Sequence, residues 1–268
     1  MHTDNTNTMP DTTPDINDLR KLHELYGNKL TIEEVREQLD EAGLLEWFEE
    51  DAGFFGHMLR HPMHYAVPFM LCEGEVRRAI ECIDAKQERV AQLDSEGGFD
   101  RAIFMHERPY RFQAFMERRS RMIPEVAANI MGEVWIDSEN IRQHLDEWSQ
   151  LWAWVTARDL AALTMREDDE RKKLLALQKA GDTWIYRGVN RTRQTKLGLS
   201  WTTDRERAIW FASRFVEDPA DALVYSTIVP LCDAPKAFMA CFDGRGEDEV
   251  VVHPAWLADN EHTITEAE

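Results

Sequence analysis

The spacing of apolar residues changes once along this chain, near Gly181. Up to about Ala180 the apolar positions recur every three or four residues, which is the spacing of one helix face. After Gly181 apolar and polar residues alternate, and runs of β-branched and aromatic residues follow, as is typical of strands. The sequence therefore predicts an α+β protein with a disordered polar tail at 1–28, a mostly helical region at 29–180 and a strand-rich domain at 181–268.

The helical region contains recognisable helix boundaries. Thr31 and Glu34 have the spacing of a capping box, so a helix is predicted to begin there. The Ser-Glu-Gly-Gly run at 95–98 is expected to end a second helix. That second helix is expected from about Val76 to Leu93. Three further helices are expected: Arg101 to Arg121 with Pro109 kinking or starting it, one capped by Asp137 or Ser138 that runs to about Leu163, and a charged surface helix from Arg166 to Lys179.

In the strand-rich domain, three segments have the composition of strands: 183–189, 223–229 and 248–252. Between the first two, residues 205–215 predict a short amphipathic helix that begins after Asp204 as its N-cap. The prediction for this domain is a set of strands with one inserted helix.

The charge of the chain is strongly acidic, with 50 Asp and Glu against 31 Lys and Arg and a net charge of −19. Such a charge disfavours direct binding to nucleic acid or an anionic membrane and steers a basic protein partner toward the chain. No apolar run approaches the roughly 20 residues of a membrane span. The polar opening lacks a signal peptide and the four cysteines lack CxxC spacing, so the expected location is the cytoplasm of the producing or target cell.

Several common site types have no support in the sequence. His57, His61 and His64 have spacing that metal ligands can have, but Pro62 interrupts the helix they would need, so no metal site is predicted. The glycine-rich and nucleophile motifs of dehydrogenases, P-loop enzymes and serine hydrolases do not occur.

Two segments carry polar side chains on strands that the sequence predicts. In Tyr186-Arg187-Gly188, the arginine guanidinium is next to a glycine, where a ligand can approach the backbone closely. A guanidinium can bind a diphosphate or a carboxylate through two parallel hydrogen bonds. Ser200 and Thr202 alternate to one side of a short strand, and their hydroxyls can orient a carboxylate or a ribose. Taken alone, the first segment is more typical of a surface salt bridge, and the second of an ordinary strand-turn-helix with a Ser/Thr turn.

A third segment supplies two carboxylates. Glu247 and Glu249 are two residues apart at the start of an expected strand, so they share one face of it. Two such acids can divide into an activating base and a stabiliser of a cationic transition state. The alternative is an acidic turn.

Taken in order, the three segments resemble the arginine, serine and glutamate motifs of ADP-ribosyltransferases of the cholera-toxin-like group. The matching residues are Arg187, then Ser200-Trp201-Thr202, then Glu247-Asp248-Glu249, and the resemblance spans about Thr183 to Pro254. Trp201 and Thr202 replace the usual small hydroxyl residues. Only 13 positions separate Arg187 from Ser200, which leaves no room for a helix between them.

The resemblance implies a small split β-sandwich and an NAD-dependent mono-ADP-ribosyltransferase, with NAD as the substrate that is cleaved. It implies that Glu249 stabilises the oxocarbenium-like transition state and that Ser200 positions Glu249. Glu247 would engage the acceptor, and the Glu-x-Glu pair suggests arginine as the modified side chain, with free arginine and simple NAD hydrolysis as open alternatives to a protein acceptor. The acidic helical region would recruit a basic protein as the target.

The same resemblance assigns the cofactor contacts. Arg187, beside Gly188, would hold the phosphates, Thr202 would support the nicotinamide pocket, and Trp201 or Tyr186 would stack on nicotinamide. Because the family's intervening helix is missing, support is expected from Trp148 and Trp152 in the preceding helices or from the loop at 190–197.

Related domains occur in secreted toxins, phage proteins and cellular regulators, so an effector-like role is expected. A second class of function stays open at this point: a non-catalytic inhibitor or interaction protein whose acidic surface binds a basic, nucleic-acid-binding partner.

Overall fold

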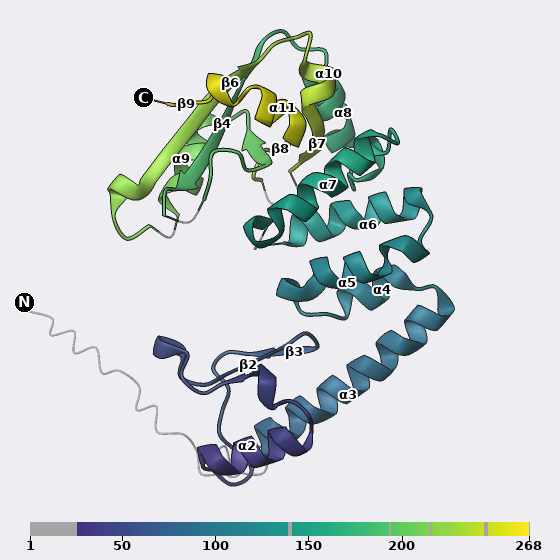
Figure 1. The fold of residues 1–268 in the computed structure, drawn as a ribbon, viewed down its shortest axis with the longest axis vertical. Helices are drawn as coiled ribbons and strands as arrows, with labels where there is room; N and C mark the ends of the chain where they lie inside the picture. The colour runs from purple at the N-terminus through teal and green to yellow at the C-terminus, as the bar shows by residue number, and fades with distance from the viewer. Residues whose placement is uncertain (1–25, 139–140, 193, 215, 244–245, 268) are drawn as a thin grey trace, which may run out of the picture. The chain divides into compact units, whose positions relative to one another are not determined.

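The computed structural model describes residues 26–138, 141–192, 194–214, 216–243 and 246–267 (Figure 1). The expected tail at 1–28 lies almost wholly outside these residues. The chain forms two compact units, Met1–Glu107 and Arg108–Glu268, and both combine helices with an antiparallel sheet. In the described part of the chain, no helix is both long enough and apolar enough to cross a bilayer.

Among its described residues, the first unit contains the helices α2 (Ile32–Glu41), α3 (Glu73–Glu96) and α4 (Phe99–Phe104). The capping box at the start of α2 is confirmed, since the Thr31 hydroxyl accepts from the Glu34 amide at 3.2 Å and the Glu34 carboxylate accepts from the Thr31 amide at 2.8 Å. The glycine stop after α3 is also confirmed, because Gly97 adopts a left-handed conformation with φ of 76°.

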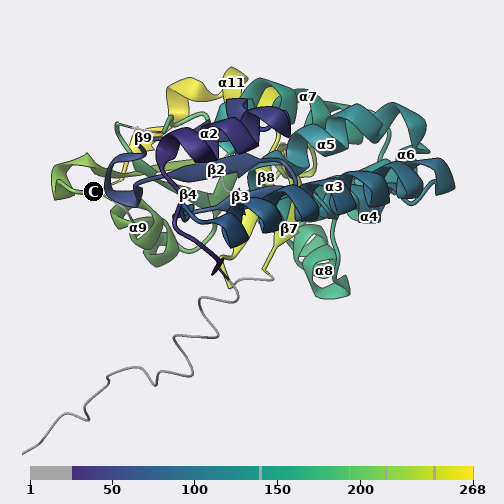
Figure 2. The ribbon, with the colours of Figure 1, turned by 90° about the horizontal axis from the view of Figure 1, so that it is seen from below.

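A three-stranded sheet accompanies these helices, with β1 (Phe48–Glu49), β2 (Met58–His61) and β3 (His64–Ala66) in that order. Figure 2 labels β2 and β3 of this sheet. The sequence did not predict it within the helical region. Strands of two to four residues are too short to show an alternating pattern. One apolar core joins the sheet to the helices, and it includes Val35, Leu39, Leu59, Phe69, Val76 and Ile83.

Two of the three spaced histidines contact aromatic rings that pack on this core, His57 at Phe48 and His61 at Trp47. The His57 ring bonds the Glu50 carbonyl oxygen at 2.6 Å, and His61 Nδ1 accepts from the Met63 amide at 3.0 Å. Burial, together with the neighbouring His64 and His106, lowers the pKa of His61 to about 4. Among the described residues, no group of three or more His, Cys, Asp or Glu is placed to hold a metal ion.

The second unit begins with helices that precede the change in periodicity: α5 (Arg111–Arg118), α6 (Pro124–Asp137), α7 (Leu145–Thr156) and α8 (Asp168–Leu177). The helix expected at 101–121 is interrupted, because a 3-10 turn at Arg108–Tyr110 contains Pro109. The boundary between the two compact units lies between residues 107 and 108. The change from the helical to the strand-rich sequence pattern lies further along the chain, between residues 180 and 181.

The predicted helix cap at Asp137 or Ser138 is wrong. Asp137 is the last residue of α6, and Ser138 follows it as the C-cap. The Asp137 carboxylate pairs with Arg108 and Arg111, while the Ser138 hydroxyl donates to the Val134 carbonyl at 2.7 Å. Neither side chain is used to begin α7, which starts at Leu145.

A cluster of indoles joins the helices of this unit to its sheet. The Trp135 ring of α6 meets the Trp148 and Trp152 rings of α7 edge-on, at centroid distances of 4.9 and 5.4 Å. Trp152 in turn contacts Phe242 at 6.4 Å. Phe242 lies on a strand of the sheet, so α6 and α7 share one core with it.

The sheet of the second unit has six strands in the order β7-β8-β5-β4-β6-β9, and every neighbouring pair is antiparallel. The strands are β4 (Thr183–Asn190), β5 (Ser200–Thr202), β6 (Ala222–Val229), β7 (Phe238–Phe242), β8 (Glu249–Val252) and β9 (Thr265–Glu266). The three segments predicted as strands are confirmed as β4, β6 and β8.

The expected helix after Asp204 is confirmed as α9 (Arg205–Ser213), whose first amides donate to the Asp204 carboxylate. The expectation of a single inserted helix is wrong, because α10 (Ala234–Ala237) and α11 (Pro254–Asp259) are also present. Both helices are short and carry proline in their first turn, a place where proline fits a helix.

The sheet is divided in the middle. Among the described residues, β4 pairs with β5 at one position, Tyr186 opposite Thr202, whereas β4 pairs with β6 over its whole length. One half is therefore β7-β8-β5 and the other is β4-β6-β9. Apart from that pair, the described residues of β4 and β5 form no ladder with each other.

Candidate active site

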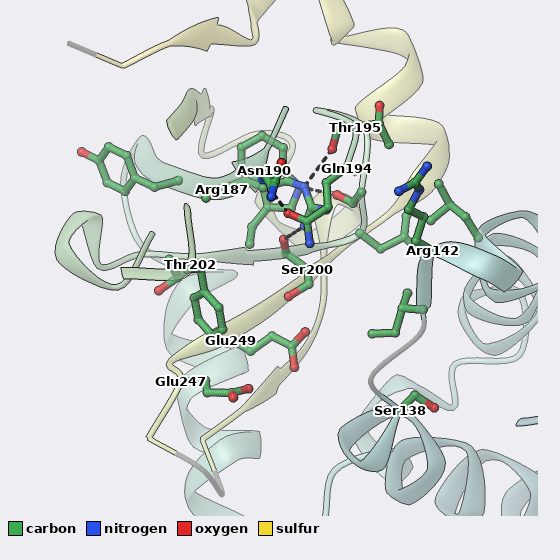
Figure 3. Close-up of a pocket in the computed structure, with 18 of the residues that line it drawn as sticks. Ser138, Arg142, Arg187, Asn190, Gln194, Thr195, Ser200, Thr202, Glu247 and Glu249 are labelled. Atoms are coloured by element: carbon green, nitrogen blue, oxygen red, sulfur yellow. Dashed lines mark hydrogen bonds between the residues drawn. The ribbon is translucent and has the colours of Figure 1, made fainter. Parts of the chain in front are cut away.

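A pocket of about 530 Å³ opens in the second unit beside the junction of β4 and β5 (Figure 3). Its walls come from the connection between α6 and α7, from β4 and the loop after it, from β5, from the end of α9 and from the start of β8. The residues singled out from the sequence line it together: Tyr186, Arg187, Gly188, Ser200, Trp201, Thr202, Glu247 and Glu249.

Arg187 is held by backbone carbonyl groups of the opposite wall. Its Nε donates to the Thr195 oxygen at 3.1 Å, and its Nη1 donates to the Ser200 oxygen at 2.6 Å. Burial lowers the pKa of Arg187 to about 10, and the Glu249 carboxylate opposes that shift, so the guanidinium is protonated at neutral pH. The two bonds use two of its five N–H donors, and the pocket can use the others.

The position of this guanidinium depends on Gly198. A β-carbon at residue 198 would lie 2.0 Å from Nη2 and 2.3 Å from Cζ of Arg187. The missing side chain thus provides the space in which the guanidinium lies. Sequence reasoning did not single out Gly198, although a glycine two residues before Ser200 is visible in the sequence.

Glu249 is the first residue of β8 and lies between two other strands. It is paired with Thr202 of β5 on one side and Phe242 of β7 on the other, and it is only 8% exposed. Directly opposed residues of antiparallel strands project to the same face, so Glu249 and Thr202 share a face. Ser200 is opposite Val251, and is therefore on that face too, one diagonal step from Glu249.

Thr202 and Asp248 have structural partners. The Thr202 hydroxyl accepts from the Asp204 amide at 3.1 Å, at the start of α9. Asp248 has a left-handed backbone with φ of 53°, and its carboxylate bonds the Thr203 hydroxyl at 2.8 Å and pairs with Lys173. Asp248 therefore binds Lys173 and Thr203, while its neighbours Glu247 and Glu249 line the pocket.

The aromatic residues differ in their exposure to the pocket. Trp201 is 2% exposed and its indole donates to the Gly198 carbonyl at 2.8 Å, so its ring is fixed in the wall. Tyr186 is half-buried and stacks on Trp184 at 6.3 Å. Trp148 and Trp152, expected to support the site, are fully buried and do not line the pocket.

The helical wall of the pocket is instead formed by residues near the end of α6 and the start of α7: Trp135, Ser138, Ile141, Arg142 and Leu145. Arg142 was not singled out from the sequence. In the view of Figure 3, Arg142 and Arg187 lie toward one end of the pocket, and Glu247 and Glu249 lie toward the other. In that view, these two cations thus lie apart from the two carboxylates.

The loop at 190–197 also contributes to the wall, as expected. Asn190 and Gln194 both line the pocket. They are joined by a hydrogen bond in which the Asn190 backbone amide donates to Gln194 Oε1 at 3.0 Å. The Asn190 carboxamide accepts from the Thr192 amide at 3.0 Å. These bonds shape the described part of the loop.

Comparison of the chain with protein-family models, with characterised proteins and with solved structures gave no match. The assignment of a function therefore depends on the residues of the pocket and their geometry.

Proposed function

We propose that the second unit is an NAD-dependent mono-ADP-ribosyltransferase that modifies arginine on a basic protein. The observation that carries the proposal is that Arg187, Ser200, Glu247 and Glu249 come from three separate segments and line one pocket. These are the residues of the three ADP-ribosyltransferase-like motifs. Their convergence was not implied by the sequence spacing alone.

The division of the sheet supports the same proposal. Two antiparallel halves that the described residues join through the pair Tyr186–Thr202 are compatible with the split β-sandwich that the resemblance implies. The pocket lies beside that division, and its volume is within the range of small-ligand sites, about 300–1,000 Å³.

The distribution of charge suits a dinucleotide with an anionic diphosphate and a cationic nicotinamide end. Arg187 and Arg142 can hold the diphosphate, because guanidinium groups bind phosphate oxygens through parallel N–H donors. The Glu249 carboxylate is largely buried, so its charge acts on a developing cation with little screening by water.

The reaction breaks the bond between nicotinamide and the ribose C1′, and nicotinamide leaves with the bonding electron pair. Positive charge develops on the ribose, where the Glu249 carboxylate stabilises it. The guanidinium nitrogen of the acceptor then bonds to C1′ and releases a proton. Glu247 orients this guanidinium and accepts the proton as the general base.

The direct test is incubation of the purified chain with labelled NAD and a cell lysate, with Glu249→Gln in parallel. The expected result is label on a protein band with wild type and none with the variant. Absence of both transfer and nicotinamide release by the folded wild type would contradict the proposal and favour the acidic binding protein instead.

Gly198→Ala is expected to raise the KM for NAD by roughly tenfold, because the new β-carbon displaces the Arg187 guanidinium that contacts phosphate. The displaced guanidinium also loses its bonds to the Thr195 and Ser200 carbonyl groups, so the free energy of unfolding should fall by about 1–3 kcal/mol. Initial rates of nicotinamide release and urea unfolding measure the two effects. An unchanged KM would show that this position of Arg187 is not needed for NAD binding.

A further inference from the structure

Helix α8 lies against the strand that leads to the two pocket carboxylates. It packs on β7, and β7 ends at Phe242, just before the chain turns toward Glu247 and Glu249. Two side chains of α8, Glu170 and Lys173, contact the described residues of that turn.

The first contact is an ion pair between Lys173 and Asp248. Both side chains are 27% exposed, so the pair is partly shielded from water. The other carboxylate oxygen of Asp248 accepts from the Thr203 hydroxyl at 2.8 Å, at the end of β5. Asp248 is thus bound on two sides, and its left-handed backbone separates the two pocket carboxylates.

The second contact is made by Glu170, which is 3% exposed. Its Oε1 accepts from the Asp243 amide at 2.9 Å. Asp243 in turn accepts the Gly246 amide on its carbonyl at 2.7 Å and the Asp248 amide on its carboxylate at 3.2 Å. One helix therefore binds both Asp243 and Asp248.

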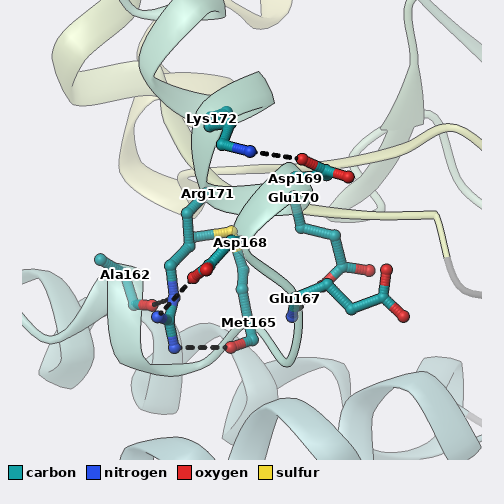
Figure 4. Close-up of polar contacts among 8 residues, drawn as sticks. All are labelled: Ala162, Met165, Glu167, Asp168, Asp169, Glu170, Arg171 and Lys172. Atoms are coloured by element: carbon teal, nitrogen blue, oxygen red, sulfur yellow. Dashed lines mark hydrogen bonds and ion pairs between the residues drawn. The ribbon is translucent and has the colours of Figure 1, made fainter.

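Helix α8 is itself fixed at its start (Figure 4). Arg171 donates from Nε to the Ala162 carbonyl at 2.9 Å and from Nη2 to the Met165 carbonyl at 3.2 Å. Glu167 and Glu170 form a capping box at its first turn. The helix can consequently act as a rigid support for the residues it binds.

We propose that Lys173 and Asp248 are positioning residues, which direct Glu247 and Glu249 into the pocket by fastening the residue between them to α8. The inference rests on the proposed transferase function. In this proposal neither Lys173 nor Asp248 touches the substrate or the reacting atoms. Loss of the pair removes one of the two attachments of the Asp248 side chain and leaves the bond to the Thr203 hydroxyl. A displacement of about 1 Å in a neighbouring pocket carboxylate can cost roughly 10²-fold in rate.

The test compares Lys173→Met with Lys172→Met in the full chain. Lys172 is the matched control because it stands on the same helix and pairs with Asp169 at 2.7 Å, but both its side chain and that of Asp169 are largely exposed. Lys173→Met is expected to lower kcat for NAD cleavage at least tenfold with KM for NAD nearly unchanged. Lys172→Met should match wild type, and Lys173→Arg should recover most of the rate.

Amide hydrogen exchange of residues 246–251 provides a readout that needs no activity. It should become faster in Lys173→Met and stay unchanged in Lys172→Met. Equal kcat and equal exchange in the two variants would overturn the positioning role. If wild type cleaves no NAD, the transferase proposal fails, and exchange alone decides whether α8 fastens this segment. If Lys173→Met does not fold, Asp248→Asn, which tolerates the left-handed backbone, takes its place.

Discussion

Replacing Glu249 by glutamine is expected to slow NAD cleavage by about 10²–10³-fold, which is the usual cost of removing one electrostatic stabiliser of a transition state. Glu249 is 8% exposed and lies between β5 and β7, so its charge acts where water is largely excluded. Glutamine keeps the shape of the side chain and removes its charge. The KM for NAD should change little, because the role is confined to the transition state. Nicotinamide release under saturating NAD measures this effect.

Glu247→Gln is the matched variant, since Glu247 lines the same pocket two residues earlier. It is expected to leave NAD hydrolysis within a few-fold of wild type and to lower transfer to arginine much more, because its role is to prepare the acceptor. Transfer to an arginine-containing peptide and hydrolysis to free ADP-ribose are measured side by side. Equal loss of both reactions in the two variants would contradict separate roles for the two acids.

The parts of the fold that could be predicted depend on neighbours a few residues apart. Thr31 with Glu34, and Asp204 with the amides of Glu206 and Arg207, form their bonds within one helical turn. Such signals are complete in the sequence itself. Strands β4 and β6 could also be predicted, because each is eight residues long and its alternating pattern is complete within one segment.

Elements that depend on distant partners were not predictable in the same way. Asp137 looks like a helix cap in the sequence, yet arginines 26 and 29 positions earlier bind its carboxylate, and α6 continues through it. The short strands β1, β2 and β3 show too few residues for a period to emerge. In these cases tertiary contacts outweigh local preference.

The pocket shows the same division between local and distant information. The motifs identified Arg187, Ser200 and Glu249, but Arg142 enters from the connection of α6 and α7, about 45 residues before Arg187. The role of Gly198 follows from a contact with a side chain 11 positions away. The spacing of residues within one segment predicts neither the position of Arg142 at the pocket nor the contact of Gly198 with Arg187.

Gly188→Ala is expected to destabilise the second unit by about 3 kcal/mol, at the upper end of the usual cost of overpacking. A β-carbon at 188 would lie 1.9 Å from the Ala208 carbonyl oxygen and 2.6 Å from the Ala212 nitrogen, both backbone atoms of α9. Backbone atoms in a helix cannot turn aside as the end of a side chain can. The glycine on β4 thus provides room for α9 to approach the strand. Urea unfolding, with the slope m unchanged, measures the loss.

Gly181→Ala is the control, because a β-carbon there meets nothing within 4 Å, and it should change stability by less than about 0.5 kcal/mol. Equal urea midpoints for the two variants would contradict the close approach of α9 to β4. The same comparison tests the link to the pocket, since Phe211 and Arg214 at the end of α9 line it. A Gly188→Ala protein that is less stable but keeps the wild-type KM for NAD would show that α9 supports the sheet alone. A raised KM would show that the approach of α9 also shapes the site.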